Sequence, residues 1–316
     1  MQTKQLAPGV YGLLSNIANV YALGAPGEPW VLVDTSTSGH FEAIREAAQS
    51  IYGPNARPEA IVLTHAHFDH YGSALPLATY WDVPVFAHHL DLPYLTGKAV
   101  APPLDPTVLG FFGFATRFMP QSGTDLGDRV QGLPESATSA KTGPVPFAPT
   151  WHWHFTPGHS PGHVSLFRDS DRVLIAGDAV TTVNLDKATD TLAKKQSLSL
   201  PPTPATSDWI AARKSMLYLA TLLPQVVAAG HGIPMDDADM PAKFERFAED
   251  VITPLHGRYI PEPAVADENG VVYLPPPAPD PYKLTAIGLG LFAAVAGTAL
   301  YLRKRGDEEA VSRRKS

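Results

Sequence analysis

The stretch IVLTHAHFDH, residues 61–70, decides the fold because its side chains change abruptly from aliphatic to metal-binding. Its first residues are apolar and mostly β-branched, which predicts a short buried strand at Ile61–Leu63. Residues two apart in an extended segment face the same way, so His65 and His67 are expected to project together beyond that strand. Residues 71–81 then have helical spacing, and a helix is predicted to follow.

The same stretch predicts a metal site. Four candidate ligands fall within six positions: His65, His67, Asp69 and His70. Neutral imidazole and carboxylate groups are ligands that Zn, Mn or Fe accept. A histidine-rich loop formed by chance is the alternative interpretation, but the order HxHxDH at the end of a strand argues against it.

The motif HAHFDH, residues 65–70, resembles the signature of the metallo-β-lactamase superfamily. The surroundings of its remaining ligands follow in the family's order, with His159 in TPGHSPGH, Asp178 in LIAGDA and His231 in AAGHG. Asp34, in VLVDTS, matches the acidic residue of the family's first motif. Within the superfamily, the chain resembles the glyoxalase II and lactonase-like branch.

The resemblance implies two divalent metal ions, with zinc expected first and manganese or iron as alternatives. Seven ligands form two sets joined by one carboxylate: His65, His67 and His159 for one ion, Asp69, His70 and His231 for the other, and Asp178 bridging both. Two ions about 3.5–4 Å apart can share a carboxylate and a hydroxide. Asp34 is expected to orient a ligand histidine through its free N–H.

The chemistry implied by the resemblance is hydrolysis of an ester-like bond, in a thioester, lactone or lactam, by attack of a metal-bound hydroxide. A catalytic zinc lowers the pKa of its water to about 7, so no serine or cysteine nucleophile is required. Asp69 and His231 are the predicted catalytic residues, and Asp69 is expected to carry a proton to the leaving group. The expected partner is a small-molecule substrate. The phenylalanines of residues 98–150, described below, would favour an apolar one.

Composition excludes several other classes. The 316 residues carry a formal net charge of −7, which disfavours nucleic-acid binding because that function usually needs a basic face. The chain has no cysteine, so disulfides and thiolate metal ligands are both excluded. A lactamase subclass that binds metal through a cysteine is thereby excluded as well.

Predicted strands and helices alternate along residues 1–256, which indicates crossover connections and helices packed over sheets. Together with the resemblance, this alternation predicts an α/β fold, a four-layer αββα sandwich, as the catalytic domain. Residues 98–150 depart from regular patterning, and long irregular segments often form lids. Four phenylalanines could line a metal cleft from this insertion, or pack a helix on the domain: Phe111, Phe112, Phe114 and Phe118.

Beyond the predicted domain, residues 257–283 are rich in proline and are expected to form an extended linker. Residues 284–302 carry no charge, and as a helix they would span roughly 28 Å, close to the ~30 Å of a bilayer core. This predicts a transmembrane helix followed by a charged tail at 303–316, and hence a membrane protein with a single-pass C-terminal anchor.

The orientation of that anchor is left open by conflicting signals. The basic residues after the helix favour a cytoplasmic C-terminus, whereas the lack of an apparent signal peptide favours a cytoplasmic catalytic domain, which we expect. Small residues four apart on the predicted helix would allow two anchors to pack as a homodimer: Ala286, Gly290, Ala294 and Thr298.

Two further functions are compatible with these motifs. A mono-iron sulfur dioxygenase on the same fold would use a histidine–histidine–aspartate set, but all seven ligand positions are filled here, which favours two metals and hydrolysis. A non-catalytic, membrane-tethered binding module would not need intact ligands. Metal-dependent hydrolysis is therefore the predicted function.

Overall fold

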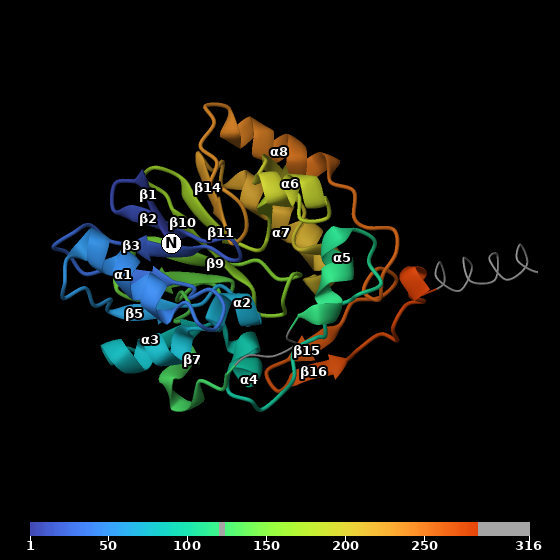
Figure 1. Cartoon of the computed structure of the whole chain (residues 1–316), viewed down its shortest axis with the longest axis horizontal. Coiled ribbons are helices and arrows are strands. Elements are labelled where there is room, and N and C mark those ends of the chain that lie inside the picture. Colours follow the sequence, from blue (N-terminus) through green and yellow to red (C-terminus); the bar gives the residue numbers. More distant parts are fainter. Residues whose placement is uncertain (120–123, 284–316) are drawn as a thin grey trace, which may run out of the picture. The chain divides into compact units, whose positions relative to one another are not determined.

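The computed structural model describes residues 1–119 and 124–283. The chain divides into two compact units, Met1–Pro277 and Ala278–Ser316, and only residues 278–283 of the second are described. All helices and strands named below lie in the first unit (Figure 1).

The first half of this unit forms a seven-stranded sheet whose strands follow chain order. Its first four strands are antiparallel neighbours: β1 (Gln2–Ala7), β2 (Val10–Leu14), β3 (Val20–Leu23) and β4 (Val31–Val33). The next three continue parallel to β4: β5 (Ala60–Val62), β6 (Val85–Ala87) and β7 (Val130–Gly132). Parallel neighbours need crossover connections, and the first two include α1 (Phe41–Tyr52) and α3 (Ala74–Trp81).

The second half forms a five-stranded sheet with the order β14-β11-β10-β9-β8. Four of its strands are antiparallel in turn: β8 (Thr142–Val145), β9 (Ala148–Phe155), β10 (Val164–Arg168) and β11 (Val173–Gly177). The crossover from β11 includes the pair β12 (Thr181–Val183) and β13 (Gln196–Ser199), which flank α6 (Ala188–Ala193), and then α7 (Trp209–Thr221). It returns to β14 (Val226–Ala229), which is parallel to β11, and α8 (Met240–Asp250) follows.

Three layers of buried apolar side chains hold these elements together. Neighbouring residues of a strand face opposite sides of a sheet, so Val62 of β5 packs between the sheets with Trp153, whereas Ile61 packs outward with Ile44 of α1. A third layer, which includes Phe244 of α8, lies on the outer face of the second sheet. Figure 1 shows α1 and α3 on one side of the sheets and α7 and α8 on the other, which is the predicted αββα order.

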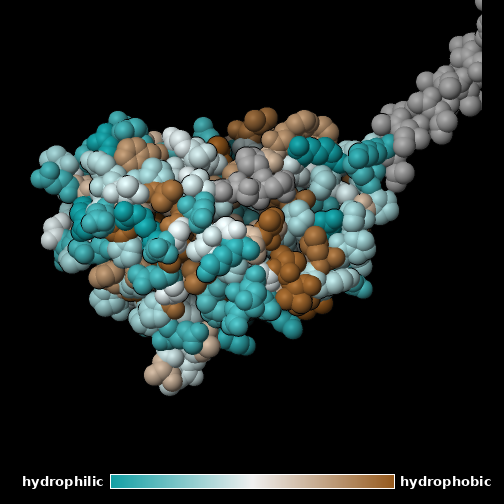
Figure 2. Space-filling view, turned by 90° about the horizontal axis from the view of Figure 1, so that it is seen from below, coloured by the Kyte–Doolittle hydropathy of each residue, from teal (hydrophilic) through white to brown (hydrophobic). Residues whose placement is uncertain are grey.

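The segment 98–150, predicted as an irregular insertion, contains regular structure that joins both sheets. It includes α5 (Phe111–Ala115), η2 (Thr116–Phe118) and η3 (Gly127–Arg129), and it supplies β7 to one sheet and β8 to the other. These elements are three to five residues long, too short for periodicity to reveal them. Three of the four phenylalanines are exposed: Phe111, Phe114 and Phe118. On the face of the molecule drawn in Figure 2, hydrophobic residues form patches among hydrophilic ones.

The segment predicted as an extended linker, 257–283, also contains a hairpin, formed by β15 (Val265–Asp267) and β16 (Gly270–Tyr273). The N–H of Ala264 donates to the carbonyl of Ser207 at 2.9 Å, and a Cβ at Gly270 would lie 2.4 Å from Ala99. The hairpin is therefore docked on the domain, and the compact unit extends past residue 256 to Pro277.

The predicted membrane anchor requires a correction. Within residues 1–119 and 124–283 no helix has both the length and the apolar character needed to cross a bilayer. The longest helix there, α7, has 13 residues, or ~20 Å, against the ~30 Å that a bilayer core requires. The prediction of a transmembrane fold with a membrane location is thus wrong for the described chain, and segment 284–302 lies outside the described residues.

Candidate metal centre

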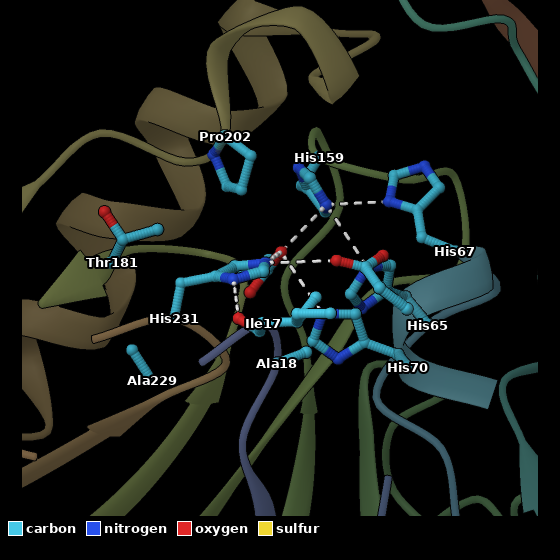
Figure 3. Close-up of polar contacts among 12 residues, drawn as sticks. Ile17, Ala18, His65, His67, His70, His159, Thr181, Pro202, Ala229 and His231 are labelled. Atoms are coloured by element: carbon cyan, nitrogen blue, oxygen red, sulfur yellow. Dashed lines mark hydrogen bonds and ion pairs between the residues drawn. The ribbon is translucent and has the colours of Figure 1, made fainter. Parts of the chain in front are cut away.

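The candidate ligands lie where strands of both sheets end. Asp34 follows β4, the HAHFDH motif follows β5, and Asp178 follows β11 directly, while His231 lies two residues beyond β14. Because β4 and β5 are parallel, and β11 and β14 are parallel, the carboxyl ends of each pair lie at one edge of their sheet. In Figure 3 the histidines from these separate segments point toward one another.

Three histidines converge through their ring nitrogens. His159 Nε2 lies 2.8 Å from Nδ1 of His67 and 3.2 Å from Nε2 of His65. The HAHFDH motif supplies two of these rings and the TPGHSPGH loop supplies the third. We refer to His65, His67 and His159 as the tri-histidine group, and it can hold a metal ion.

One carboxylate oxygen lies between this group and the remaining ligands. Asp178 Oδ2 is 3.4 Å from Nε2 of His159, 3.4 Å from Nε2 of His70 and 3.1 Å from Nε2 of His231. The last of these nitrogens is also 3.4 Å from Oδ2 of Asp69. We refer to Asp69, His70 and His231 as the acidic group, and it too can hold an ion. The structure thus brings all seven predicted ligands together.

Two buried polar atoms in this cluster lack a hydrogen-bond partner among the described residues. They are Nε2 of His70 and Oδ1 of Asp178, and both side chains are at most 2% exposed. An unsatisfied buried polar atom costs about 1–3 kcal/mol. Both atoms point into a cluster of further nitrogen and oxygen donors of the kind that divalent ions bind. The residues present therefore fit a metal centre.

The other ring nitrogens of four histidines have protein partners, which leaves Nε2 free to face the centre. His70 Nδ1 lies 2.8 Å from Oδ2 of Asp34, and His231 Nδ1 lies 2.7 Å from the carbonyl of Ile17. The corresponding Nδ1 atoms of the two remaining histidines face hydroxyl groups: His65 at 3.0 Å from Thr64 Oγ1, and His159 at 3.3 Å from Thr206 Oγ1. Such contacts fix ring orientation and tautomer.

Asp34 has the contact expected from its motif and a further one. Its carboxylate accepts the N–H of Thr64 at 2.7 Å and the hydroxyl of Thr64 at 2.8 Å, in addition to facing His70. Its backbone φ is 59°, a left-handed conformation that aspartate tolerates better than most residues. One buried carboxylate therefore connects the segment before the HAHFDH motif to a ligand within it.

The two groups differ in electrostatics. Burial, together with neighbouring histidines, lowers the pKa of His65 and His159 well below the ordinary value and that of His67 to about 4. Burial would also lower the pKa of His70 and His231, but the nearby carboxylates, above all Asp178, outweigh it and raise both. Burial would raise the pKa of Asp178, yet His231 and His70 hold it well below its usual range.

His163, which the motif TPGHSPGH places four residues after His159, supports the segment that carries Asp178. Its Nε2 accepts the backbone N–H of Asp178 at 2.9 Å, and its Nδ1 lies 2.9 Å from the Thr156 hydroxyl. Burial lowers the pKa of His163 to about 3, so the ring stays neutral and can accept that N–H. Gly177 is required beside it, because a Cβ there would lie 2.6 Å from Nε2 of His163.

Asp91 is a buried residue of the site that the sequence did not reveal. It ends η1 (His89–Asp91), and its carboxylate accepts the N–H of Ala66 at 2.8 Å, the hydroxyl of Ser160 at 3.1 Å and the N–H of Gly162 at 2.8 Å. Burial raises the pKa of Asp91 to about 6. The side chain therefore joins the HAHFDH motif to the loop that carries His159.

Asn19 is a second supporting residue without a sequence signal. Its side-chain N–H groups donate to the carbonyls of Ala229 at 3.1 Å and Gly232 at 2.7 Å, on either side of His231.

Four further histidines lie outside the metal-binding groups found among the described residues: His88, His89, His152 and His154.

Comparisons with known proteins agree with this geometry. The model of the metallo-beta-lactamase superfamily matches residues 16–231. A probable metallo-hydrolase of Bacillus subtilis (strain 168), YflN, is 44% identical over 234 residues, which cover 73% of this chain and 86% of that protein. A second probable metallo-hydrolase of the same organism, YybB, is 31% identical over 160 residues, or 51% of this chain and 61% of that protein.

Solved structures share the fold at low identity. An archaeal metallo-beta-lactamase superfamily protein, ST1585 from Sulfolobus tokodaii, superposes with a TM-score of 0.52 at 19% identity, covering 77% of this chain and 86% of that one. The metallo-beta-lactamase SMB-1 gives a TM-score of 0.51 at 17% identity, covering 73% of this chain and 80% of its own.

Proposed function

This chain belongs to the metallo-β-lactamase superfamily and is a metal-dependent hydrolase, and we propose that it cleaves an ester-like bond in a thioester, lactone or lactam. The proposal includes two divalent ions, with zinc as the expected metal. The tri-histidine group would hold one ion, the acidic group the other, and Asp178 would lie between them.

The observation that carries the proposal is the position of Asp178. A single oxygen of this buried carboxylate lies within 3.4 Å of a nitrogen from the tri-histidine group and of two from the acidic group. A carboxylate shared in this way suits two neighbouring ions. A single ion would occupy only one of the two groups and would leave the other group of ligands without a metal.

Bound divalent ions supply an activated water and polarise the carbonyl of the substrate. The residues of the chain would orient the ligand side chains and transfer a proton to the leaving group. Asp34 and the carbonyl of Ile17 hold the Nδ1 atoms of His70 and His231, so that both rings present Nε2 to the centre.

Asp69 is the residue proposed to move a proton. It is the more accessible of the two ligand carboxylates, 9% exposed against 1% for Asp178, and its Oδ2 lies 3.4 Å from His231 Nε2. A carboxylate with access to solvent can accept a proton at Oδ2 and deliver it to a departing oxygen, nitrogen or sulfur atom. His231 would hold this carboxylate in place.

The test combines metal content with a substrate panel. The purified protein is analysed for Zn, Mn and Fe, and assayed with an aryl thioester, a lactone and a β-lactam. We expect about two zinc ions per chain and turnover of at least one of these substrates. One iron per chain, with oxygen consumption on a persulfide substrate, would instead establish a sulfur dioxygenase and overturn the proposal.

A matched control separates the centre from histidines elsewhere. His67→Ala should lower metal content and turnover together, because it removes a ring of the tri-histidine group. His88→Ala removes a histidine that stacks on Phe155 and lies outside the groups, so it should retain both properties. Equal losses in the two variants would count against the assigned centre.

A further inference from the structure

A cleft of about 860 Å³ opens beside the acidic group, on the side of the N-terminal strands. His231 is part of its wall, so the cleft reaches the metal centre directly. Its other lining residues come from β1 and β2, from the loop after β2, from the start of α1, from the region around α6, and from the two residues after His231. A molecule bound in this cleft would lie against a candidate metal ligand.

The charges on this wall are of one sign. Lys4 and Lys194 both line the cleft, and none of its lining residues in the described chain is an aspartate or glutamate. The chain as a whole carries a net charge of −7, so the positive charge of the cleft is opposite in sign to that of the whole chain. A cleft whose charged side chains are lysines, with no carboxylate among its lining residues, attracts anions and raises their local concentration.

Lys194 is connected to the metal centre by successive contacts. Its Nζ lies 2.6 Å from the side-chain oxygen of Asn16, and the next residue, Ile17, accepts the Nδ1–H of His231 at 2.7 Å through its carbonyl. Lys194 also ends α6 in a left-handed conformation with φ 49°, which turns the chain at this position. Figure 3 shows Ile17 beside His231 at the centre.

Lys4 reaches the cleft from a different segment. It lies on β1, the edge strand of the first sheet, and pairs with Gly12 of β2. Gln2, two residues earlier, also lines the cleft, as expected for residues on one face of a strand. Apolar side chains line the cleft as well, among them Leu14 and Val183.

We propose that this cleft binds the substrate, and that the substrate carries an anionic group, a carboxylate or phosphate, joined to the scissile bond by a short apolar segment. The anion would lie between Lys4 and Lys194, the apolar segment against Leu14 and Val183, and the reacting carbonyl beside His231. This inference rests on the proposed function, because it assigns a substrate class to the same centre.

The experiment compares two substrates that differ only in charge. These are the 4-nitrophenyl half-ester of adipic acid and the corresponding adipamide ester, assayed with the metal-loaded protein. Lys194→Met and Lys4→Met remove an ammonium but keep most of the apolar stem. We expect the wild-type protein to prefer the anionic ester in kcat/KM, and each variant to lose about threefold to fivefold of that preference, the effect of one exposed ion pair.

Lys195→Met is the matched control. Lys195 is also exposed and immediately adjacent in sequence, but it is not among the residues that line the cleft. Its removal changes the net charge by the same amount, so an effect of overall charge would lower the preference equally in Lys194→Met and Lys195→Met. That result would overturn the proposal.

A binding measurement separates this inference from the proposed function. Equilibrium dialysis with labelled adipate, and competition by unlabelled butyl phosphate, measure anion binding without any turnover. Adipate binding that weakens in Lys194→Met but not in Lys195→Met supports the cleft even if no ester is hydrolysed, and the tighter of the two ligands identifies the anion. Binding of neither adipate nor butyl phosphate would overturn the inference while leaving ester hydrolysis intact.

Discussion

The tri-histidine group and the acidic group of the candidate metal centre differ in the direction in which the pKa values of their histidines are shifted. In the tri-histidine group, burial above all lowers the pKa of every ring, with further lowering by nearby histidines, so His65, His67 and His159 are neutral near pH 7. In the acidic group, carboxylates outweigh burial and raise the pKa of His70 and His231, which favours the protonated form of these rings when no ion is bound. The first group is ready to bind an ion, whereas the second must release protons to do so.

The contrast follows from where the carboxylates lie. The contacts of His70 with Asp34 and of His231 with Asp69 belong to the acidic group alone, and Asp178 touches both groups. In the absence of metal, protonated rings and carboxylates of the acidic group neutralise one another. An ion bound there replaces the protons as the positive charge. We therefore expect the two ions to bind with different affinities and different pH dependence.

The largest expected effect comes from the carboxylate that both groups share. Asp178→Ala should lower hydrolytic activity by at least about 100-fold and reduce metal content at both groups, because metal-site partners typically contribute 10–100-fold each in affinity or activity. Circular dichroism should show an unchanged fold. Elemental analysis and turnover measure the outcome, and a variant that keeps both ions and full activity would show that Asp178 is not shared.

The pH dependence of metal binding tests the contrast directly. Between pH 6 and pH 8 the affinity of the acidic group should rise with pH, by about tenfold per pH unit for each proton displaced, since the raised pKa values of His70 and His231 make an ion compete with protons for these rings. The affinity of the tri-histidine group should change little, because its rings have already lost their protons. Zinc titration calorimetry at several pH values measures both. Parallel pH profiles would contradict the difference.

Asp34→Asn should weaken the acidic group far more than the tri-histidine group, which Asp34 reaches only through the Thr64 hydroxyl. The amide lacks the charge that faces His70 Nδ1, so the acidic group should lose about 10–100-fold in metal affinity, the usual cost of removing such a partner. The tri-histidine group should keep its ion, giving one tight and one weak site. Cobalt titration followed by visible absorption distinguishes the two sites, and equal weakening of both would show that Asp34 acts only on the fold.

Asp91→Asn should produce the smallest change in metal affinity, and this change should affect the tri-histidine group. Asp91 joins the backbone around His65 and His67 to the loop of His159, so we expect its loss to weaken the tri-histidine group by about tenfold. The measurement is again cobalt titration, with thermal unfolding recorded in parallel. The acidic group should be unaffected.

Asp105→Asn is the matched control for this prediction. Asp105 is also buried and also accepts three donors, the N–H and hydroxyl of Thr107 and the N–H of Arg258, but it does not contact the loops that carry the ligands. Both variants should lose about 1–3 kcal/mol of stability. A loss of metal affinity in both would reduce Asp91 to a structural residue.

Predictions from local motifs agreed with the structure where the physics is local. The strand predicted at Ile61–Leu63 forms as β5, and the helix predicted over residues 71–81 forms as α3, preceded by the short α2 (Phe68–Tyr71) that carries Asp69 and His70. The alternation of predicted strands and helices, together with the resemblance, predicted the layers, and in the structure each strand residue faces one core or the other. The transmembrane helix was predicted from hydropathy alone, and the described chain contains no helix that could serve as one.

Short motifs, through their resemblance to the family, predicted the αββα order and the seven candidate ligands, because each motif is a short run of neighbouring residues that can be recognised without the fold. Only the tertiary structure decided what supports and surrounds them. Asp91 contacts Ala66, 25 residues away, and Gly162, 71 residues away, and Lys194 meets Asn16 across 178 residues. Contacts at such separation leave no local pattern, because chain folding alone brings those side chains together.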